Sequence, residues 1–288
     1  MVLYIIGLGL GTEKDITLRG LEAVKSSSAL FLESYTSVLC VSKEKLEELY
    51  GKPVTIATRD MVESESDRIL SGAKDGNVSM LVVGDPVCAT THTDMMIRAR
   101  ELGIKVELVH NASVMGAAGC CGLHLYNFGK TISVPFFTEG WRPTSFHPMV
   151  LYNRRGDMHT LCLLDIKVRE PDFEAMKRGR TEYLPPRFMS VNVALEQMLE
   201  AADVSEDKEK GAYDKDTLCV GMARLGQADE CIKAGSMSEL LSEDFGEPLH
   251  CLVVCSDDVH ELEMEALDCF IVEGSRYKDW RTQQQGGD

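Results

Sequence analysis

The chain has 288 residues, which exceeds the usual range of about 100 to 200 for one domain, and its 44% hydrophobic and 26% charged residues are typical of soluble globular proteins. Forty-six acidic against thirty basic side chains give a formal net charge of −16. This charge opposes the neutralisation of phosphates, so we expect no nucleic acid and no membrane as partner.

The ten cysteines indicate free thiols rather than a metal site or a disulfide framework. No pair has the Cys-x-x-Cys spacing of a structural zinc site, and the adjacent Cys120 and Cys121 cannot readily hold one ion in tetrahedral geometry. The chain opens with a strand rather than a secretion signal, and no apolar run approaches the about 18 residues that a membrane span needs. We therefore expect a cytoplasmic protein without a metal.

In chain order, the first half alternates strands with helices. The predicted strands are residues 2–7, 29–32, 54–57, 78–83 and 106–109. The predicted helices are 16–24 with Asp15 as N-cap, 43–50 between Ser42 and Gly51, 60–70, 93–102, and one that opens at 111–113. This alternation predicts a mostly parallel sheet with helices on both faces.

Three loops follow the carboxyl ends of the predicted strands. They are residues 7–11, 84–92 and 110–113. Because open parallel sheets bind ligands at this edge, the three loops together predict a ligand site.

The second half has longer and more varied connections. A β-rich run at 131–137 leads to a joining loop at 141–143, and the main strands are predicted at 160–166, 217–225 and 250–255. Helices are predicted at 190–202, 228–241 and 260–270. We expect two α/β domains, 1–133 with a mostly parallel sheet and 134–288 with a mixed sheet.

The opening glycines have two other interpretations. One is that they serve only the packing of a tight turn, and the other is that they belong to a dinucleotide fingerprint. The fingerprint is imperfect because Thr12 stands where a third small residue is expected after Gly7 and Gly9, although Glu33 lies 22 positions beyond Gly11, near the usual spacing of a ribose-binding acid. A nicotinamide-dependent oxidoreductase is therefore an alternative function.

Several runs resemble a known family. The glycine loop, Gly84-Asp85-Pro86 and His110-Asn111-Ala112-Ser113 resemble the class III S-adenosylmethionine-dependent methyltransferases, whose fold is shared with the tetrapyrrole methylases. Longer runs are similar to diphthine synthase, in its eukaryotic form that makes diphthine methyl ester: Ala89-Thr90-Thr91-His92, Gly119-Cys120-Cys121-Gly122-Leu123, Pro185-Pro186-Arg187-Phe188-Met189-Ser190-Val191-Asn192 and Gly246-Glu247-Pro248-Leu249-His250. These motifs occur in order across residues 2–270.

The resemblance implies a cofactor, a substrate and an assembly. The cofactor is S-adenosyl-L-methionine, bound in a cleft between the two domains of a homodimer. The substrate is the modified histidine of translation elongation factor 2, in diphthamide biosynthesis. The family's cofactor contacts, carried over by position, fall on Leu10, Asp85, Cys88, Ser113, Val114, Leu164, Leu225 and His250. Cys88 departs from the family, in which we expect glycine, and only a backbone contact tolerates that change.

Methyl transfer from a sulfonium is a direct displacement, so orientation and exclusion of water suffice without a catalytic triad or metal. We assign no catalytic base: His92 and Glu33 are candidates, but a structural role or a substrate contact is favoured for both. Each polar site residue also has a structural interpretation, as an Asx-turn for Asp85, a helix cap for Ser113 and a strand-end histidine for His250.

Three alternative functions remain open beside the diphthine methyl ester synthase. They are a tetrapyrrole methylase, the nicotinamide-dependent oxidoreductase, and a non-catalytic adaptor that binds elongation factor 2 or another protein through its acidic surface.

Overall fold

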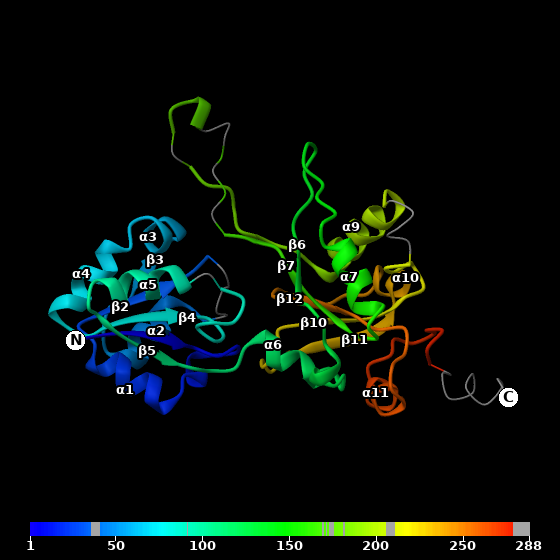
Figure 1. The fold of residues 1–288 in the computed structure, drawn as a ribbon, viewed down its shortest axis with the longest axis horizontal. Coiled ribbons are helices and arrows are strands. Elements are labelled where there is room, and N and C mark those ends of the chain that lie inside the picture. Colours follow the sequence, from blue (N-terminus) through cyan, green and yellow to red (C-terminus); the bar gives the residue numbers. More distant parts are fainter. Residues whose placement is uncertain are drawn as a thin grey trace. The chain divides into compact units, whose positions relative to one another are not determined.

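A computed structural model describes residues 1–35, 41–90, 92–168, 170, 172, 176–180, 182–205 and 211–278. One of the ten cysteines, Cys40, and Thr91 of the resemblance motif lie outside these residues. The chain divides into two compact units, each of mixed α/β structure (Figure 1). Unit 1 is Met1–Ala117 with Ile166–Arg187, and unit 2 is Ala118–Asp165 with Phe188–Asp288. The domain boundary expected after residue 133 and the cleft expected between the domains stay predictions.

Unit 1 is built on a parallel sheet. Among its described residues, five strands follow the order β3-β2-β4-β1-β5 and all pair in parallel. Their bounds are β1 Val2–Gly7, β2 Ala29–Glu33, β3 Thr55–Ala57, β4 Val78–Val82 and β5 Lys105–Val109. The helices are η1 Glu13–Asp15, α1 Leu18–Ser26, α2 Lys43–Tyr50, α3 Arg59–Glu63, α4 Asp67–Asp75, α5 Thr93–Glu101 and α6 Val114–Ala117. The predicted mostly parallel sheet is confirmed.

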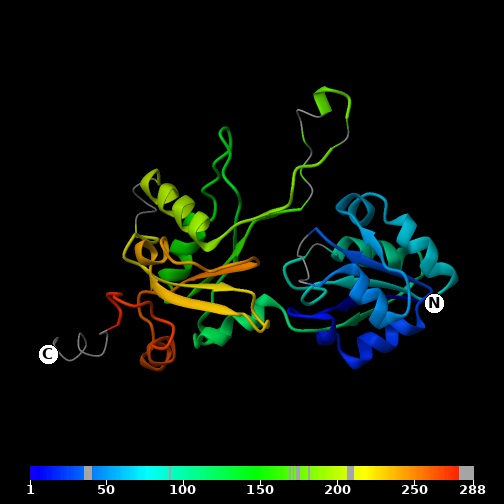
Figure 2. The same ribbon diagram turned by 180° about the vertical axis from the view of Figure 1, so that it is seen from behind.

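Side chains alternate between two cores, one on each face of this sheet. Ile5 and Met80 pack with α3, α4 and α5, whereas Ile6 and Leu81 pack with α1 and α2. This period of two follows from strand geometry, and all five residues of β4 are buried because the strand is covered on both faces. The two views of Figures 1 and 2 show the helices flanking the sheet.

Two helix predictions in unit 1 were wrong in detail. The N-cap of α1 is Thr17 rather than Asp15, since the Thr17 hydroxyl accepts the Gly20 amide at 3.0 Å. The helix predicted over 60–70 is two helices, α3 and α4. The Glu65 amide bonds back to the Asp60 carbonyl at 2.8 Å, which ends α3 and lets the chain turn into α4.

Unit 2 is built on a mixed sheet, as predicted. In the described part of the chain its strand order is β11-β10-β12-β7-β6, with β6 parallel to β7 and the other neighbours antiparallel. The strands are β6 Ile132–Val134, β7 Thr160–Leu164, β10 Leu218–Ala223, β11 Cys231–Ser236 and β12 His250–Val254. The helices are η2 Ala118–Cys121, η3 Leu125–Asn127, α7 His147–Arg154, α9 Val191–Asp203, α10 Met237–Leu240 and α11 Glu261–Leu267.

The helix predicted over 228–241 was also wrong. Residues Cys231–Ser236 form β11, and only Met237–Leu240 is helical as α10. β11 returns antiparallel to β10, with Val220 opposite Ala234, and Ser236 then caps α10 in a capping box with Glu239. The pairing with β10 overrides the weak helical pattern of the segment because strand formation depends on neighbouring strands.

A hairpin lies in the chain between β7 and α9. Its strands are β8 Ile166–Lys167 and β9 Arg187–Phe188, which pair only with each other among the described residues. We call the described residues from Ile166 to Phe188 the arm, drawn in green to yellow-green in Figure 1. The predicted strand 160–166 is thus β7 followed by the first residue of the arm.

Candidate functional site

The three predicted loops lie together at one edge of the unit 1 sheet. They follow β1, β4 and β5, which are neighbours in the order β4-β1-β5. Backbone bonds join the first two loops: Leu8 N to Val82 O at 2.8 Å, Gly9 N to Gly84 O at 3.2 Å, and Gly84 N to Gly9 O at 2.8 Å. The prediction that these loops share the carboxyl edge is confirmed.

Glycine is required here by close backbone approach. A Cβ on Gly7 would lie 2.5 Å from the Gly84 carbonyl oxygen, and one on Gly9 would lie 2.7 Å from the Asp15 Cβ. Gly9 also has φ +80°, in the left-handed region that favours glycine. The packing interpretation of these glycines therefore holds, and it is compatible with a ligand at the same edge.

Asn111 ties the third loop to the first. Its Nδ2 donates to the Gly7 carbonyl and to the Asp15 carbonyl, each at 2.9 Å, while its Oδ1 accepts the Ala112 amide at 2.8 Å. From the sequence, Asn111 belongs to the motif that follows the fifth strand, and no role was assigned to its side chain. The available signal was an asparagine placed directly after a strand end, where its short amide reaches neighbouring backbone.

The carboxylate of Asp15 explains Thr12, the residue that departs from the dinucleotide fingerprint. Asp15 Oδ2 accepts the amides of Gly11 at 2.7 Å and Thr12 at 2.8 Å, and the Thr12 hydroxyl accepts the Lys14 amide at 3.2 Å. Thr12 thus caps the 3-10 helix η1 in a capping box. These hydrogen bonds, rather than a third small residue, stabilise the turn of the loop.

Asp85 is the electrostatic centre of the edge. It is 5% exposed, its Oδ1 accepts the Val87 amide at 3.0 Å, and its Oδ2 accepts the Asn111 amide at 3.1 Å and His110 Nδ1 at 2.9 Å. Burial raises the pKa of this carboxyl, but the bonds from Val87, Asn111 and His110 outweigh it and leave the pKa below its ordinary value. The Asx-turn is therefore present, and the site carries a fixed negative charge.

The other unit 1 positions lie in or next to the same three loops as Asp85. Leu10 is half-buried in the glycine loop, and the Cys88 amide donates to the Asp85 carbonyl at 3.3 Å. A Cβ on Gly84 would lie 3.9 Å from the Ser113 Cα, so Ser113 and the adjoining Val114 border the second loop. Cys88 is not among the non-glycine residues with positive φ, so a side chain is tolerated there.

The remaining three positions share one end of the unit 2 sheet. Leu164 is the last residue of β7 and His250 is the first of β12, one step beyond the Leu163 and Cys251 pair. Leu225 follows β10, whose Ala223 lies opposite His250. Leu164 and Leu225 are each 8% exposed, so this end of the sheet is apolar around His250.

His250 is fixed by main-chain contacts. Its Nε2 lies 3.1 Å from the Gly246 carbonyl and 3.0 Å from the Glu247 carbonyl, while its Nδ1 accepts the Val191 amide at 3.3 Å. Because carbonyls only accept, Nε2 carries the proton of a neutral ring. Burial lowers the pKa of His250, and the two carbonyls offset only part of that effect. Its side chain therefore has the structural role that the sequence favoured.

Arg224 holds the two loops that flank Leu225 and His250. Its Nη1 donates to the Phe245 carbonyl at 2.8 Å and also to the Glu247 carbonyl, and its Nε donates to Asp229 Oδ2 at 2.7 Å. The residue has φ +53°, so the backbone is strained to place this guanidinium. No local signal in the sequence marks Arg224, since its contacts lie up to 23 positions away.

The two base candidates are buried in unit 1. Glu33 and His92 are each 1% exposed. Glu33 Oε1 accepts the Tyr35 amide at 2.6 Å, and His92 Nδ1 lies 2.6 Å from the Thr90 hydroxyl. Burial lowers the pKa of His92, with Glu33 partly offsetting the effect. Both side chains therefore have local structural contacts, and a role as a base or in binding a ribose stays a prediction.

The described residues hold neither a group of metal ligands nor a helix able to span a membrane. Within them, no three His, Cys, Asp or Glu side chains are grouped so that they could hold a metal ion. No helix in the same part of the chain has the length and apolar character needed to span a membrane.

Comparison with known proteins gives consistent matches. The model of the tetrapyrrole (corrin/porphyrin) methylases matches residues 2–241. A diphthine methyl ester synthase of Dictyostelium discoideum is 54% identical over 274 residues, covering 94% of this chain and 99% of the relative. One of Homo sapiens is 51% identical over 272 residues, covering 94% and 95%. A crystal structure from Entamoeba histolytica with a provisional diphthine synthase assignment is 48% identical, with a TM-score of 0.83 and coverage of 94% and 99%.

Proposed function

Because the chain belongs to the tetrapyrrole methylase family, and within it to the diphthine methyl ester synthases, we propose that it methylates the modified histidine of translation elongation factor 2 and forms diphthine methyl ester. The observation that carries this proposal is the 54% identity that extends over 99% of the Dictyostelium relative. Such identity spans both units, so it supports the specific substrate rather than the fold alone.

We further propose S-adenosyl-L-methionine as the methyl donor, in contact with Leu10, Asp85, Cys88, Ser113, Val114, Leu164, Leu225 and His250. When bound, this cofactor supplies an electrophilic methyl carbon on a sulfonium. The donor groups of the chain suit it: the buried Asp85 carboxylate favours a cation, and Leu164 and Leu225 offer apolar surface for a nucleoside. No residue among the eight requires a metal or a redox group.

The chain's own residues act by holding backbone in place. Asn111 and the Gly9 and Gly84 pair fix three loops at the edge of unit 1, and Arg224 fixes two loops in unit 2. Rigid loops orient a donor and exclude water, which is the main catalytic need of a direct displacement. No base is assigned for the proton of the attacking amine, and the candidates Glu33 and His92 are each 1% exposed.

The proposal is tested with elongation factor 2 that carries the unmethylated histidine intermediate. The expected result is transfer of labelled methyl groups from S-adenosyl-L-methionine to that histidine, with mass analysis counting the methyl groups and detecting the ester. Binding of the factor without label would support the adaptor instead. Label on a porphyrinoid precursor alone would support a tetrapyrrole methylase, and calorimetric binding of NAD alone would support the oxidoreductase.

We also propose a homodimer in the cytoplasm, as the resemblance implies. The chain mass is 31.9 kDa, so sedimentation equilibrium should return twice that value. A single-chain mass at micromolar concentration would contradict the dimer.

A further inference from the structure

The described residues of the arm form a ladder of backbone hydrogen bonds between its two strands. The Leu184 amide donates to the Glu170 carbonyl at 2.9 Å, and the Asp172 amide donates to the Glu182 carbonyl at 3.0 Å. Arg187 forms a fork with the Glu170 carboxylate, at 2.7 Å through Nε and 3.0 Å through Nη2. A bidentate pair of this kind holds the two strands in register at this point.

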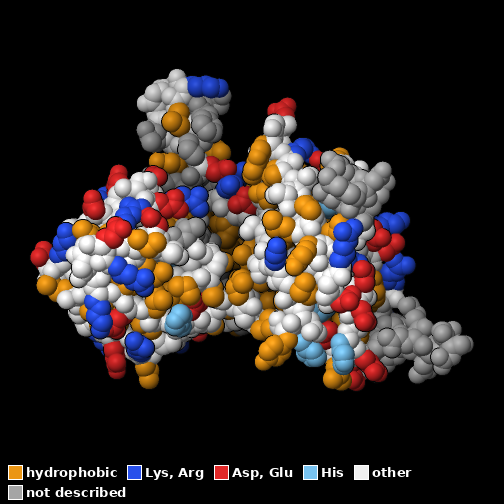
Figure 3. Space-filling view, viewed as in Figure 1, with side chains coloured by type: hydrophobic (Ala, Val, Ile, Leu, Met, Phe, Trp, Pro, Cys, Tyr) orange, Lys and Arg blue, Asp and Glu red, His pale blue; other side chains and the backbone are white. Residues whose placement is uncertain are grey.

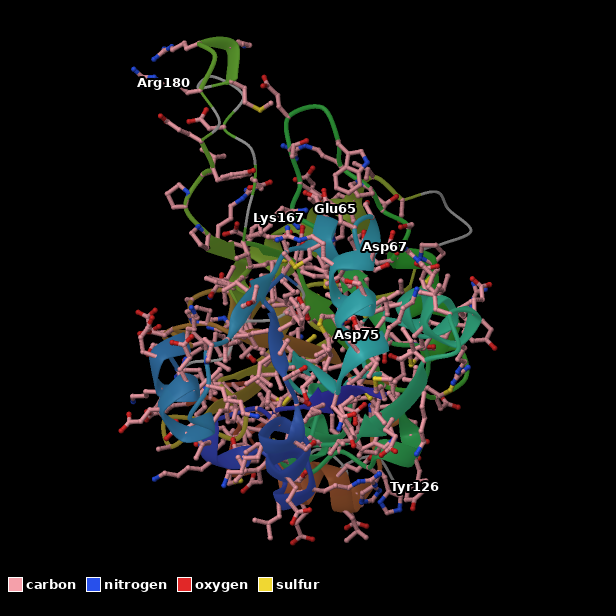
Figure 4. All side chains as sticks on the ribbon, turned by 90° about the vertical axis from the view of Figure 1, so that its left-hand side faces the viewer. Glu65, Asp67, Asp75, Tyr126, Lys167 and Arg180 are labelled. Atoms are coloured by element: carbon pink, nitrogen blue, oxygen red, sulfur yellow. The ribbon has the colours of Figure 1, made fainter. Side chains whose placement is uncertain are left out.

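The turn at the end of the arm concentrates positive charge. Lys177, Arg178 and Arg180 are exposed there, and Gly179 with φ +74° closes the turn by a bond from its amide to the Met176 carbonyl at 2.9 Å. Arg178 has no ion-pair partner in the described part of the chain, and Arg180 is 3.8 Å from Glu182, a loose pair. Figure 4 shows Arg180 at the end of the arm, and blue side chains mark that end in Figure 3.

The positive charge of this turn contrasts with the negative net charge of the whole chain. In the sequence, residues 166–188 hold six basic and four acidic side chains, whereas the whole chain has a formal charge of −16. Two of the acids, Glu170 and Glu182, pair with arginines of the arm itself. A local cation cluster on an acidic protein attracts an acidic partner surface and steers its approach.

Exposed apolar side chains accompany the cations. Every described residue from Met176 to Arg187 is exposed. Met176 is 50% exposed, Tyr183 43% and Leu184 44%, so the arm combines charge with apolar contact area. Arginine, tyrosine and methionine are enriched at protein interfaces, whereas a phosphate-binding surface would need little of this apolar area.

The arm is continuous in the chain with residues of the proposed site. β8 begins two residues after Leu164, and Met189, directly after β9, donates its amide to the Asp165 carbonyl at 3.0 Å. Val191, two residues further, donates its amide to His250 Nδ1. Both ends of the arm are therefore anchored beside two of the three proposed cofactor contacts of unit 2.

From these observations we infer that the basic turn of the arm, Lys177, Arg178 and Arg180, docks an acidic surface of the protein substrate. The inference rests on the proposed function, which requires the enzyme to hold a folded protein while one side chain reacts. The anchoring of the arm beside Leu164 and His250 favours the substrate as occupant over a partner unrelated to the reaction. The docking residues bind and do not take part in the chemistry.

The test compares methyl transfer by the full-length enzyme and by the combined variant Lys177→Gln, Arg178→Gln and Arg180→Gln. At low salt, the KM for the elongation factor should rise about tenfold or more in the variant, because three charges that steer and hold the partner are lost, while kcat stays unchanged. Added salt should raise the KM of the unchanged enzyme and affect the variant much less. Calorimetry should give both enzymes the same affinity for S-adenosyl-L-methionine.

The matched control neutralises three exposed cations on helices of unit 1, with Lys25→Gln, Arg68→Gln and Lys74→Gln. It removes the same charge, and its KM should equal that of the unchanged enzyme. A short peptide bearing the same modified histidine should react equally with all three enzymes. An unchanged KM in the arm variant, an equal loss in the control, or a change of the variant's mass in solution would each overturn the docking role. Absence of methyl transfer by the unchanged enzyme would refute the proposed function itself.

Discussion

The side chain of Asn111 binds residues that are far from it in the sequence. The carbonyls that it contacts belong to Gly7 and Asp15, about a hundred positions earlier. One short amide therefore holds the glycine loop against the loop after β5. Its place at the end of β5 makes the edge of the sheet a single unit rather than three separate turns. A longer side chain would separate these loops, and an apolar one would leave two carbonyls without a donor.

We predict that Asn111→Ala lowers the free energy of unfolding by about 1 to 2 kcal/mol, the usual cost of leaving such groups unpaired. The loss of loop order should also weaken binding of S-adenosyl-L-methionine, measured by calorimetry at a temperature where the variant is folded. Asn192→Ala is the control, since Asn192 donates to the carbonyls of Leu240, Leu241 and Glu243 in unit 2. Equal ligand affinity in the two variants would contradict the role of Asn111.

Three histidines whose pKa is lowered by burial, His92, His159 and His250, predict that stability falls in mild acid. Burial lowers the pKa of His250 and of His159, whose Nδ1 accepts the Ser256 amide at 3.0 Å. The unfolded chain binds protons near pH 6.5, before the folded protein does. Stability should be complete above about pH 6.5 and decrease as the pH falls below that value towards the lowered folded-state pKa. Denaturant unfolding at several pH values measures this slope.

The variant His250→Gln separates the contribution of His250 from those of His92 and His159. Glutamine can donate to a main-chain carbonyl but does not titrate, so part of the slope below pH 6.5 should disappear. A variant with the full slope of the unchanged protein would show that His250 does not contribute.

At the scale of elements, the glycine loop after β1 is limited by space as well as by backbone conformation. Gly9 and Gly51 both have positive φ, +80° and +65°. A Cβ on Gly51 would meet nothing within 4 Å, whereas one on Gly9 would meet Asp15 at 2.7 Å. The two positions therefore separate the effect of crowding against Asp15 from that of backbone strain.

Gly51→Ala should cost about 1 kcal/mol, the strain of a left-handed alanine, and leave methyl transfer unchanged. Gly9→Ala should cost about 3 kcal/mol, since the loop must also move away from Asp15, and should reduce methyl transfer strongly. Chemical denaturation and the labelled methyl assay measure both effects. Equal stability loss in the two variants would contradict the crowding at Gly9.

The elements that the sequence predicts well are those whose signal is local. The apolar runs around Ile5, Met80 and Val253 predict buried strands, and the glycine at position 51 predicts a helix end. β11 escaped prediction because its strand character comes from pairing with β10. The division of the helix over 60–70 also escaped, since it depends on a single backbone bond from Glu65 to Asp60.

The residues of the candidate site also divide into those that the sequence predicts and those that it does not. The loops that carry Leu10, Asp85 and Ser113 were predictable, because parallel strands place their carboxyl ends at one edge. The residues that hold those loops, Asn111 and Arg224, were not, since each acts through backbone carbonyls that the sequence does not mark. The eight cofactor contacts came from resemblance alone and stay a proposal.

At the scale of the whole molecule, the reactivity of the cysteines indicates which parts of the fold are accessible to solvent. The nine cysteines that the structure describes are free thiols. Five of them are buried in unit 2: Cys121, Cys162, Cys219, Cys251 and Cys255. Cys269 is exposed, and burial raises the pKa of the exposed Cys120 to about 11, with Glu230 adding to the rise. Thiolate availability and access therefore differ widely along one chain.

We predict that a thiol reagent at pH 8 labels Cys269 first in the folded protein, and Cys120 more slowly. The five buried thiols should react only after unfolding, and together, because they share one sheet and its coverings. Peptide mass analysis after timed labelling measures each rate. Labelling of Cys162 as fast as Cys269 under native conditions would contradict the buried core of unit 2.

The central position of β1 has a consequence for the newly made chain. β1 precedes the other described strands in the chain, yet its two neighbours, β4 and β5, end at Val82 and Val109. At usual rates of about 5 to 20 residues per second, the ribosome takes roughly 5 to 20 seconds to supply them. Throughout that interval the apolar strand β1 lacks its hydrogen-bonding partners. A stalled or shortened product would leave β1 exposed to aggregation.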